Sequence, residues 1–156
     1  MGKNILYIGI GVPGAGKSTY FKTFTRFNKP VPVVSRDEIR FSIVSETEPY
    51  FSKEDEVVKK FIAQINTALK HTDVVADATH LTQKARKTLL SKITTEHSTV
   101  AVYFNVPLEV CLERNVKRKG TRSYVPESVI KEMHSKLQEP NFDEGFDQII
   151  YTERWD

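Results

Sequence analysis

The chain has 156 residues, of which 39% are hydrophobic and 28% charged, with a formal net charge of +3 and a pI near 8.9. This length and apolar content allow one buried core and exclude a disordered chain, so we expect a single domain over residues 1–156. The mild positive charge is compatible with a polyanionic partner but does not require one.

Short apolar stretches alternate with amphipathic segments along the chain. Residues spaced as on one helix face predict a helix through Tyr20, Phe24 and Phe27. A longer helix is predicted by the stripe Val57, Val58, Phe61, Ile62, Ile65 and Leu69. Almost continuous apolar strands alternating with helices predict a parallel sheet covered on both faces, in a three-layer α/β domain. The predicted strands are Ile5–Ile10, Val31–Val34, Val74–Ala76, Val100–Phe104 and Gln148–Tyr151.

Several residues have the chemistry of a helix start. Ser52 with Asp55 resembles a capping box, in which side chains satisfy amides of the first turn. Pro107 and Pro126 each stand where a first helical residue is expected, because proline lacks only an N–H that has no intrahelical partner there.

The segment Gly11-Val-Pro-Gly14-Ala15-Gly16-Lys17-Ser18 matches the pattern GxxxxGK[ST] between a predicted strand and a predicted helix. Its glycines let backbone amides point at phosphate oxygens, beside the positive end of the helix. We expect Lys17 to bridge the β and γ phosphates of ATP and the Ser18 hydroxyl to bind Mg²⁺. Thr19 completes the segment, with a structural role favoured for its side chain. The alternative is a glycine-rich turn that binds nothing.

This loop alone does not identify a reaction, because kinases, motors, switches and remodelling ATPases share it. After the second predicted strand, Asp37 and Arg40 lie three residues apart near the carboxyl ends of the strands, where α/β sheets bind ligands. A kinase needs a carboxylate that accepts the proton of the attacking hydroxyl and a cation that holds the acceptor. Equally, Ser35 and Glu38 form a capping box in which an aspartate is favourable.

Two further segments carry charged or polar groups. Asp77 ends the third predicted strand and is followed by Thr79, with Arg86 on the next helix; a strand-end cap is the alternative for Asp77. A basic cluster at Arg114, Lys117, Arg118, Lys119 and Arg122 reads as a solvated helix face or, given the phosphate loop, as a lid over the nucleotide. Phe41, Tyr50 and Phe51 could stack on a base, although core packing is favoured for most of them.

Over almost the whole chain these motifs resemble the P-loop kinase domain of 5'-hydroxyl polynucleotide kinases and their small relatives. Arg36-Asp37-Glu38-Ile39-Arg40 is similar to the family's RDxxR element, and Asp77-Ala78-Thr79 with Arg86 to its DxT element. Arg114-Asn115-Val-Lys117-Arg118 is similar to its lid. Ala78 replaces a hydroxyl residue of the pattern, and Lys119 with one residue near Ser123-Tyr124 lengthens the lid.

The resemblance implies a five-stranded parallel sheet in the order 2-3-1-4-5 with a helical lid. It implies that Asp37 is the general base, that Arg40 binds the phosphate adjacent to the accepting hydroxyl, and that Asp77 and Thr79 help to form the acceptor site. Arg118, with Arg114, is then expected to reach the β and γ phosphates from the lid. The similarity does not extend to a phosphatase domain, so no 3'-end processing is expected.

These observations predict a kinase that uses ATP and Mg²⁺ to phosphorylate the 5'-hydroxyl end of a nucleic acid. Two alternatives stay open: a kinase of a small alcohol such as a nucleoside, sugar nucleotide or antibiotic, and a nucleotide-binding switch that transfers no phosphate. The single cysteine, Cys111, excludes an intrachain disulfide, and no apolar run is long enough to cross a bilayer. We therefore expect a cytoplasmic protein without a membrane partner and leave its oligomeric state open.

Overall fold

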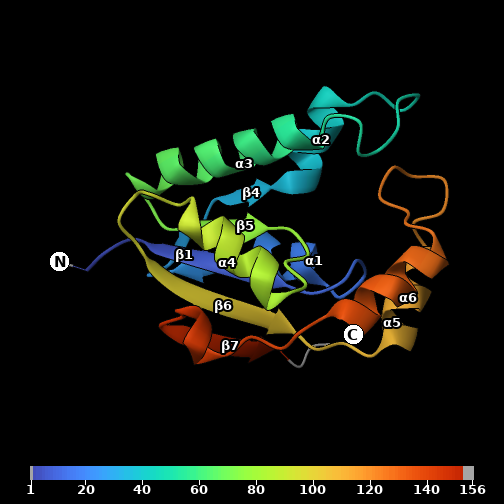
Figure 1. Ribbon diagram of the computed structural model, residues 1–156. Helices are drawn as coiled ribbons and strands as arrows, with labels where there is room; N and C mark the ends of the chain where they lie inside the picture. The colour runs from blue at the N-terminus through green and yellow to red at the C-terminus, as the bar shows by residue number, and fades with distance from the viewer. Residues whose placement is uncertain (1, 153–156) are drawn as a thin grey trace.

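Five parallel strands form the central sheet of the computed structural model, which describes residues 2–152 (Figure 1). Their spatial order is β4-β5-β1-β6-β7. Numbered in chain order, these five strands have the order 2-3-1-4-5, which confirms the predicted fold. The strands are β1 Ile5–Ile10, β4 Val33–Ser35, β5 Val74–Asp77, β6 Ser98–Phe104 and β7 Gln148–Thr152.

Helices cover both faces of this sheet and make the three predicted layers (Figure 1). One buried cluster packs strand residues such as Leu6 and Ile8 against α2, α3 and α4, and a second packs Tyr7 and Val102 against α1, α5 and α6. Side chains of a strand alternate between faces, so a strand covered on both sides is apolar throughout. The helices are α1 Lys17–Lys22, α2 Arg36–Ile43, α3 Glu54–Leu69, α4 Gln83–Ser91, α5 Leu108–Val116 and α6 Glu127–Lys136, with the 3-10 helix η1 Phe142–Glu144.

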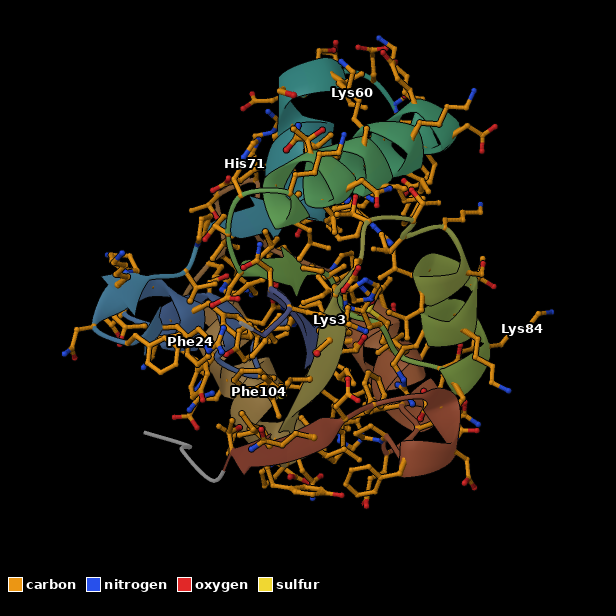
Figure 2. All side chains as sticks on the ribbon, turned by 90° about the vertical axis from the view of Figure 1, so that its left-hand side faces the viewer. Lys3, Phe24, Lys60, His71, Lys84 and Phe104 are labelled. Atoms are coloured by element: carbon orange, nitrogen blue, oxygen red, sulfur yellow. The ribbon has the colours of Figure 1, made fainter. Side chains whose placement is uncertain are left out.

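The predicted helix through Phe24 and Phe27 is wrong beyond residue 22. The chain instead forms a hairpin of β2 Thr25–Arg26 and β3 Lys29–Pro30, which projects beside the sheet next to Phe24 (Figure 2). Phe27 and Asn28 have φ angles of 53° and 62°, as a two-residue turn requires, and Phe27 is 82% exposed. The apolar spacing therefore matched a helix although only Phe24 of the pair packs against the core.

The predicted helix starts are partly corrected. Helix α3 has Lys53 at its N-cap without a side-chain cap bond, so the expected capping box of Ser52 and Asp55 is wrong. Pro107 and Pro126 are N-caps, one position before the first helical residue. The Ser35 side chain does accept a hydrogen bond from the Glu38 amide, at 3.2 Å.

The second strand of the sheet, β4, starts two residues later than predicted, at Val33 rather than Val31. It pairs with β5 through Val33–Ser35. This pairing brings Ser35 opposite Asp77, which in turn lies opposite Gly9 of β1. The segments that follow all three strands therefore meet at one edge of the sheet. Within residues 2–152, no helix has the length and apolar character that crossing a membrane requires.

Candidate active site

The phosphate loop between β1 and α1 is shaped by two glycines in the left-handed region. Gly14 and Gly16 have φ angles of 87° and 93°, which side chains other than glycine rarely adopt. A Cβ atom on Gly14 would lie 2.6 Å from the carbonyl oxygen of Cys111, so α5 packs directly on the loop. The Arg114 guanidinium, one turn further along α5, donates a hydrogen bond from Nη1 to the Gly14 carbonyl at 3.1 Å.

Lys17 closes this loop from the first turn of α1. Its Nζ donates to the carbonyl oxygens of Gly11 and Val12, at 2.8 and 3.2 Å. Burial lowers the pKa of Lys17, while the charges of Asp77 and Asp37 oppose that shift and the charge of Arg118 adds to it. The lysine predicted to bind phosphates thus lies in reach of both predicted acceptor carboxylates and of the lid arginine.

The segment after β5 is bonded directly to the phosphate-loop strand. The Gly11 amide donates to the Thr79 carbonyl at 3.1 Å, and His80 Nδ1 lies 2.7 Å from the Gly9 carbonyl. A carbonyl oxygen can only accept, so Nδ1 carries the proton. Burial lowers the pKa of His80 to about 3 and keeps the ring neutral. Asp77, at the end of β5, has its pKa raised by burial, against the opposing charge of Lys17.

A buried ion pair holds this segment from the other side. Arg86, fully buried on α4, donates from Nε and Nη2 to the two carboxylate oxygens of Glu144, at 2.6 and 3.0 Å. Its Nη1 donates to the His80 carbonyl at 2.8 Å. The arginine that the sequence placed beyond the DxT element therefore fixes the backbone of that element through η1, a contact that spans 58 residues of chain.

The acceptor side is a network of four side chains, Asp37 and three others. Arg40 Nη1 and the Tyr50 hydroxyl each donate to Asp37 Oδ1 at 2.6 Å, and Arg40 Nη1 also donates to the Tyr50 oxygen at 2.8 Å. The Asp37 side chain is 62% exposed, and its Oδ2 accepts no hydrogen bond from any residue in 2–152. One oxygen of Asp37 is thus fixed by two donors and the other is open.

Glu54 completes this network. Arg40 donates from Nη2 to Glu54 Oε1 at 2.7 Å and from Nε to Oε2 at 3.2 Å, a forked arrangement that fixes the guanidinium plane. The Arg40 residue is only 4% exposed. Glu54 was not identified from sequence as part of this site, because no local spacing relates it to an arginine 14 residues earlier. Tyr50 was considered from sequence only for stacking on a base, and not for its hydrogen bond to Asp37.

The basic cluster of the predicted lid contacts two different parts of the site, the phosphate loop and the end of α2. Arg114 contacts the phosphate loop and Arg118 is close enough for its charge to act on Lys17. Arg122 instead stacks on the Phe41 ring at 4.4 Å and donates to the Val44 carbonyl at 2.8 Å, so it is bound to the end of α2 rather than placed over the loop. A cavity of about 350 Å³ lies between these segments, lined by residues that include Arg40, Tyr50, Thr121 and Arg122.

The groups at this edge fit a magnesium nucleotide. Ser18 is an exposed residue in the first turn of α1. Together with the carboxylate of Asp77, it offers the hard oxygen ligands that Mg²⁺ prefers. The positive φ angles of the loop glycines form a backbone cradle next to the helix start, the arrangement that binds phosphates.

The sheet order, the glycine loop that leads into α1 and the loop lysine on which the charges of two carboxylates act together define a P-loop kinase, a phosphotransferase. A family profile described as an AAA domain, AAA_33, matches residues 6–140. The chain belongs to this family.

The relatives include kinases of nucleic-acid acceptors. The chain is 29% identical to an L-seryl-tRNA(Sec) kinase of Methanococcus maripaludis over 147 residues, which cover 87% of this chain and 53% of that protein. It is 28% identical to a putative bifunctional polynucleotide kinase/RNA ligase of Autographa californica nuclear polyhedrosis virus, over 88% of this chain and 22% of that protein. The chain thus spans about half the length of the first relative and about a fifth of the second.

A solved structure of a Pnkp1/Rnl/Hen1 RNA repair complex contains a similar chain. It superposes with a TM-score of 0.75 at 28% identity, over 88% of this chain and 45% of that one. Together with the viral relative, this similarity confirms the resemblance to polynucleotide kinases that the sequence motifs indicated.

Proposed function

We propose that this chain transfers the γ-phosphate of ATP to the 5'-hydroxyl end of a polynucleotide, DNA or RNA. The observation that carries the proposal is the asymmetry of Asp37, which has one oxygen fixed by Arg40 and Tyr50 and the other open. The charge of this carboxylate acts on Lys17 across the site and raises the pKa of the lysine against the effect of burial. The polynucleotide kinases among the relatives support a nucleic acid as the acceptor.

In the proposed reaction Asp37 Oδ2 accepts the proton of the 5'-hydroxyl as its oxygen forms a bond to the γ-phosphorus. The bond from the γ-phosphorus to the β–γ bridging oxygen breaks, and ADP leaves without a phosphoenzyme. Lys17 exchanges its loop carbonyls for the β and γ phosphate oxygens, and Arg118 and Arg114 add positive charge where negative charge develops. Ser18 would hold Mg²⁺, which would supply further charge neutralisation at the phosphates.

The remaining predicted residues have supporting roles in this proposal. The amides of Gly14, Ala15 and Gly16 surround the phosphates, and Thr19 supports the start of α1. Asp77 and Thr79 line the acceptor side next to Lys17. Arg40, held in place by Glu54 and Asp37, binds the phosphate adjacent to the accepting hydroxyl in this proposal.

Transfer of labelled γ-phosphate from ATP to short 5'-hydroxyl oligonucleotides tests the proposal directly. Asp37→Asn is expected to lower kcat by about 10²–10⁴-fold, because the amide cannot accept the proton. Asp143→Asn, an exposed aspartate on η1, is the matched control and is expected to keep wild-type activity. Full activity of Asp37→Asn would remove the proposed base.

A kinase of another alcohol is the second candidate, favoured by the similarity to the L-seryl-tRNA(Sec) kinase. Competition between 5'-hydroxyl oligonucleotides, nucleosides and an aminoacylated tRNA as acceptors separates the two. Preferential phosphorylation of any acceptor other than the oligonucleotide would replace the first proposal. A switch without transfer predicts nucleotide binding and no labelled product. The single domain and the cytoplasmic location expected from the sequence stay predictions.

A further inference from the structure

The hairpin of β2 and β3 carries an exposed aromatic ring at its tip, where it projects from the sheet (Figure 2). Phe27 is 82% exposed, and the Arg26 guanidinium lies over one face of its ring, 4.6 Å from the centroid. Because the residue is so exposed, the other face of the ring is open to a flat partner. Single-stranded nucleic acids stack their bases on aromatic rings of this kind, with arginine adding to the attraction.

The hairpin holds this ring in a fixed place. Arg26 Nη1 donates to both carboxylate oxygens of Asp73 at 2.9 Å, and Asp73 Oδ1 also accepts from the Ile5 amide at 2.7 Å. At the base of the hairpin, Phe24 packs edge-on against Tyr7, with ring centroids 4.8 Å apart. The hairpin is thus bound to the start of β1 and to the residue before β5. A surface that is already ordered loses little conformational entropy when it binds a ligand.

The backbone at the tip is unfavourable for the residue that it carries. Phe27 and Asn28 have φ angles of 53° and 62°. A two-residue turn of this kind favours asparagine and glycine, and a bulky side chain with a positive φ angle is rare. The turn itself therefore gives no reason for phenylalanine at this position, whereas a ligand for its ring would.

The charge of this part of the chain favours a polyanion as that ligand. Residues 1–36 contain no aspartate or glutamate. Their six basic residues are Lys3, Lys17, Lys22, Arg26, Lys29 and Arg36. The other 120 residues hold 17 basic and all 20 acidic residues, a net charge of −3. Within the hairpin, Lys29 lies opposite Arg26, so a cation stands on each side of the turn. Cations for phosphates and an open ring for a base are the two requirements of a single-strand contact.

The hairpin also lies at one end of a path that leads to the proposed base. β3 ends at Pro30, the edge strand β4 follows, and Asp37 is in the first turn of α2. A largely extended chain from residue 30 to 36 spans roughly 20 Å, at about 3.3 Å per residue. This length equals about six stacked nucleotides, at about 3.4 Å each. A strand whose 5' end lies at Asp37 therefore reaches the hairpin with a later nucleotide.

We propose that the β2–β3 hairpin is a second contact for the polynucleotide, at which a base several nucleotides from the accepting 5'-hydroxyl stacks on Phe27. Lys29 contacts the neighbouring phosphates. This inference rests on the proposed function and names where the body of the acceptor strand lies. A dinucleotide or a small alcohol at Asp37 is too short to reach the hairpin, so the contact favours long acceptors over short ones.

Calorimetry with two 5'-hydroxyl acceptors, a 12-nucleotide single strand and a dinucleotide, tests the contact. Wild-type protein is expected to bind the 12-mer at least about tenfold more tightly, the size of one base stacked on an aromatic ring. Phe27→Asn removes the ring and is expected to weaken binding of the 12-mer about tenfold, with binding of the dinucleotide unchanged. The proposal is overturned if wild-type protein does not bind the 12-mer or binds both acceptors equally, or if Phe27→Asn binds the 12-mer as tightly as the wild type.

Stability separates this role from a structural one. Asparagine tolerates the φ angle at the tip, so the urea midpoint of Phe27→Asn is expected to stay the same or rise while the affinity for the 12-mer falls. A fall in both would assign the ring to the fold and contradict the proposal.

Two further variants make the result specific. Phe142→Asn is the matched control, because Phe142 is 64% exposed but lies beside the acidic Asp143, and it is expected to bind both acceptors as the wild type does. Lys29→Gln is expected to make binding of the 12-mer less dependent on salt, because one phosphate contact is lost. Equal weakening by Phe27→Asn and Phe142→Asn, or an unchanged salt dependence in Lys29→Gln, would remove the hairpin as the contact.

The kinase proposal fails by a different readout. If the 12-mer binds through Phe27 but receives no labelled phosphate, the hairpin contact stands and the transfer reaction is wrong. If wild-type protein and Phe27→Asn phosphorylate the 12-mer with the same KM, the reaction stands and the hairpin contact is wrong.

Discussion

The phosphate loop takes its shape from consecutive residues, 11–16, whereas the network around Asp37 takes its groups from α2, the α2–α3 connection and the start of α3. In the loop, two glycines and the following helix arrange the amides, and the neighbouring α5 packs against them and adds one hydrogen bond, from Arg114 to the Gly14 carbonyl. Around Asp37, each contact joins residues that tertiary packing brings together. The groups expected to bind the donor therefore lie in one contiguous motif, whereas the groups of the acceptor side come from segments that are separate in the sequence.

The largest expected effect is on the donor side. Lys17→Ala is expected to lower kcat by about 10³-fold, because the cation that neutralises the β and γ phosphates is lost. Steady-state transfer of labelled phosphate measures this loss. Lys22→Ala, an exposed lysine at the end of α1, is the control and is expected to behave as wild type. Transfer at the wild-type rate by Lys17→Ala would mean that the loop does not bind the donor.

Glu144→Gln tests the buried ion pair with Arg86, which holds the segment after β5. It leaves the buried Arg86 without a counter-charge, so the free energy of unfolding is expected to fall by about 3 kcal/mol. Urea denaturation measures this change. Glu132→Gln removes an exposed partner of Lys136 and is expected to change stability by less than about 0.5 kcal/mol. Equal effects of the two substitutions would show that the buried pair does not hold the segment after β5.

The buried His80, in the segment after β5, predicts that the free energy of unfolding depends on pH. Its pKa is about 3 when folded and 6.5 ordinarily, so the unfolded chain binds the proton first as pH falls. The stability contributed by the neutral ring is present above pH 6.5 and is lost from pH 6.5 toward 3, by about 2 kcal/mol at pH 5.

His80→Asn is the variant that tests this dependence. Asparagine tolerates the φ angle of 47° at this position and can donate to the Gly9 carbonyl. Urea denaturation at pH 7 and pH 5 is expected to show a loss about 2 kcal/mol smaller in the variant than in the wild type. The same loss in both proteins would assign the acid sensitivity to other groups.

The smallest expected effect separates the acceptor side from the donor side. Tyr50→Phe removes one of the two donors to Asp37 Oδ1 and is expected to lower kcat about tenfold, with the KM for ATP unchanged. Tyr151→Phe is the matched control. Tyr151 lies on the edge strand β7, and the substitution removes a hydroxyl that donates a hydrogen bond to Glu139. An increase in the KM for ATP in Tyr50→Phe would show that the two sides are not independent.

The sequence by itself determined the sheet and the phosphate loop. Strands buried on both faces are apolar throughout, and the loop depends on backbone conformations that its own glycines permit, so β1 and the position of the phosphate loop were predictable. The strand order was predicted from the resemblance to a kinase family rather than from the apolar pattern. The hairpin at Phe27 was not predictable, because the spacing of three aromatics fits a helix as well as a turn that exposes one of them.

Only the tertiary structure decided which charged groups face one another. Asp37 and Arg40 were visible as a pair three residues apart, but the binding of Arg40 by Glu54 and the hydrogen bond of the Tyr50 hydroxyl to Asp37 follow from how α3 packs on α2. The physical reason is that an ion pair depends on distance in space. Helix α3 is positioned by its buried apolar face, and the residues of that face carry no information about the partners of its first turn.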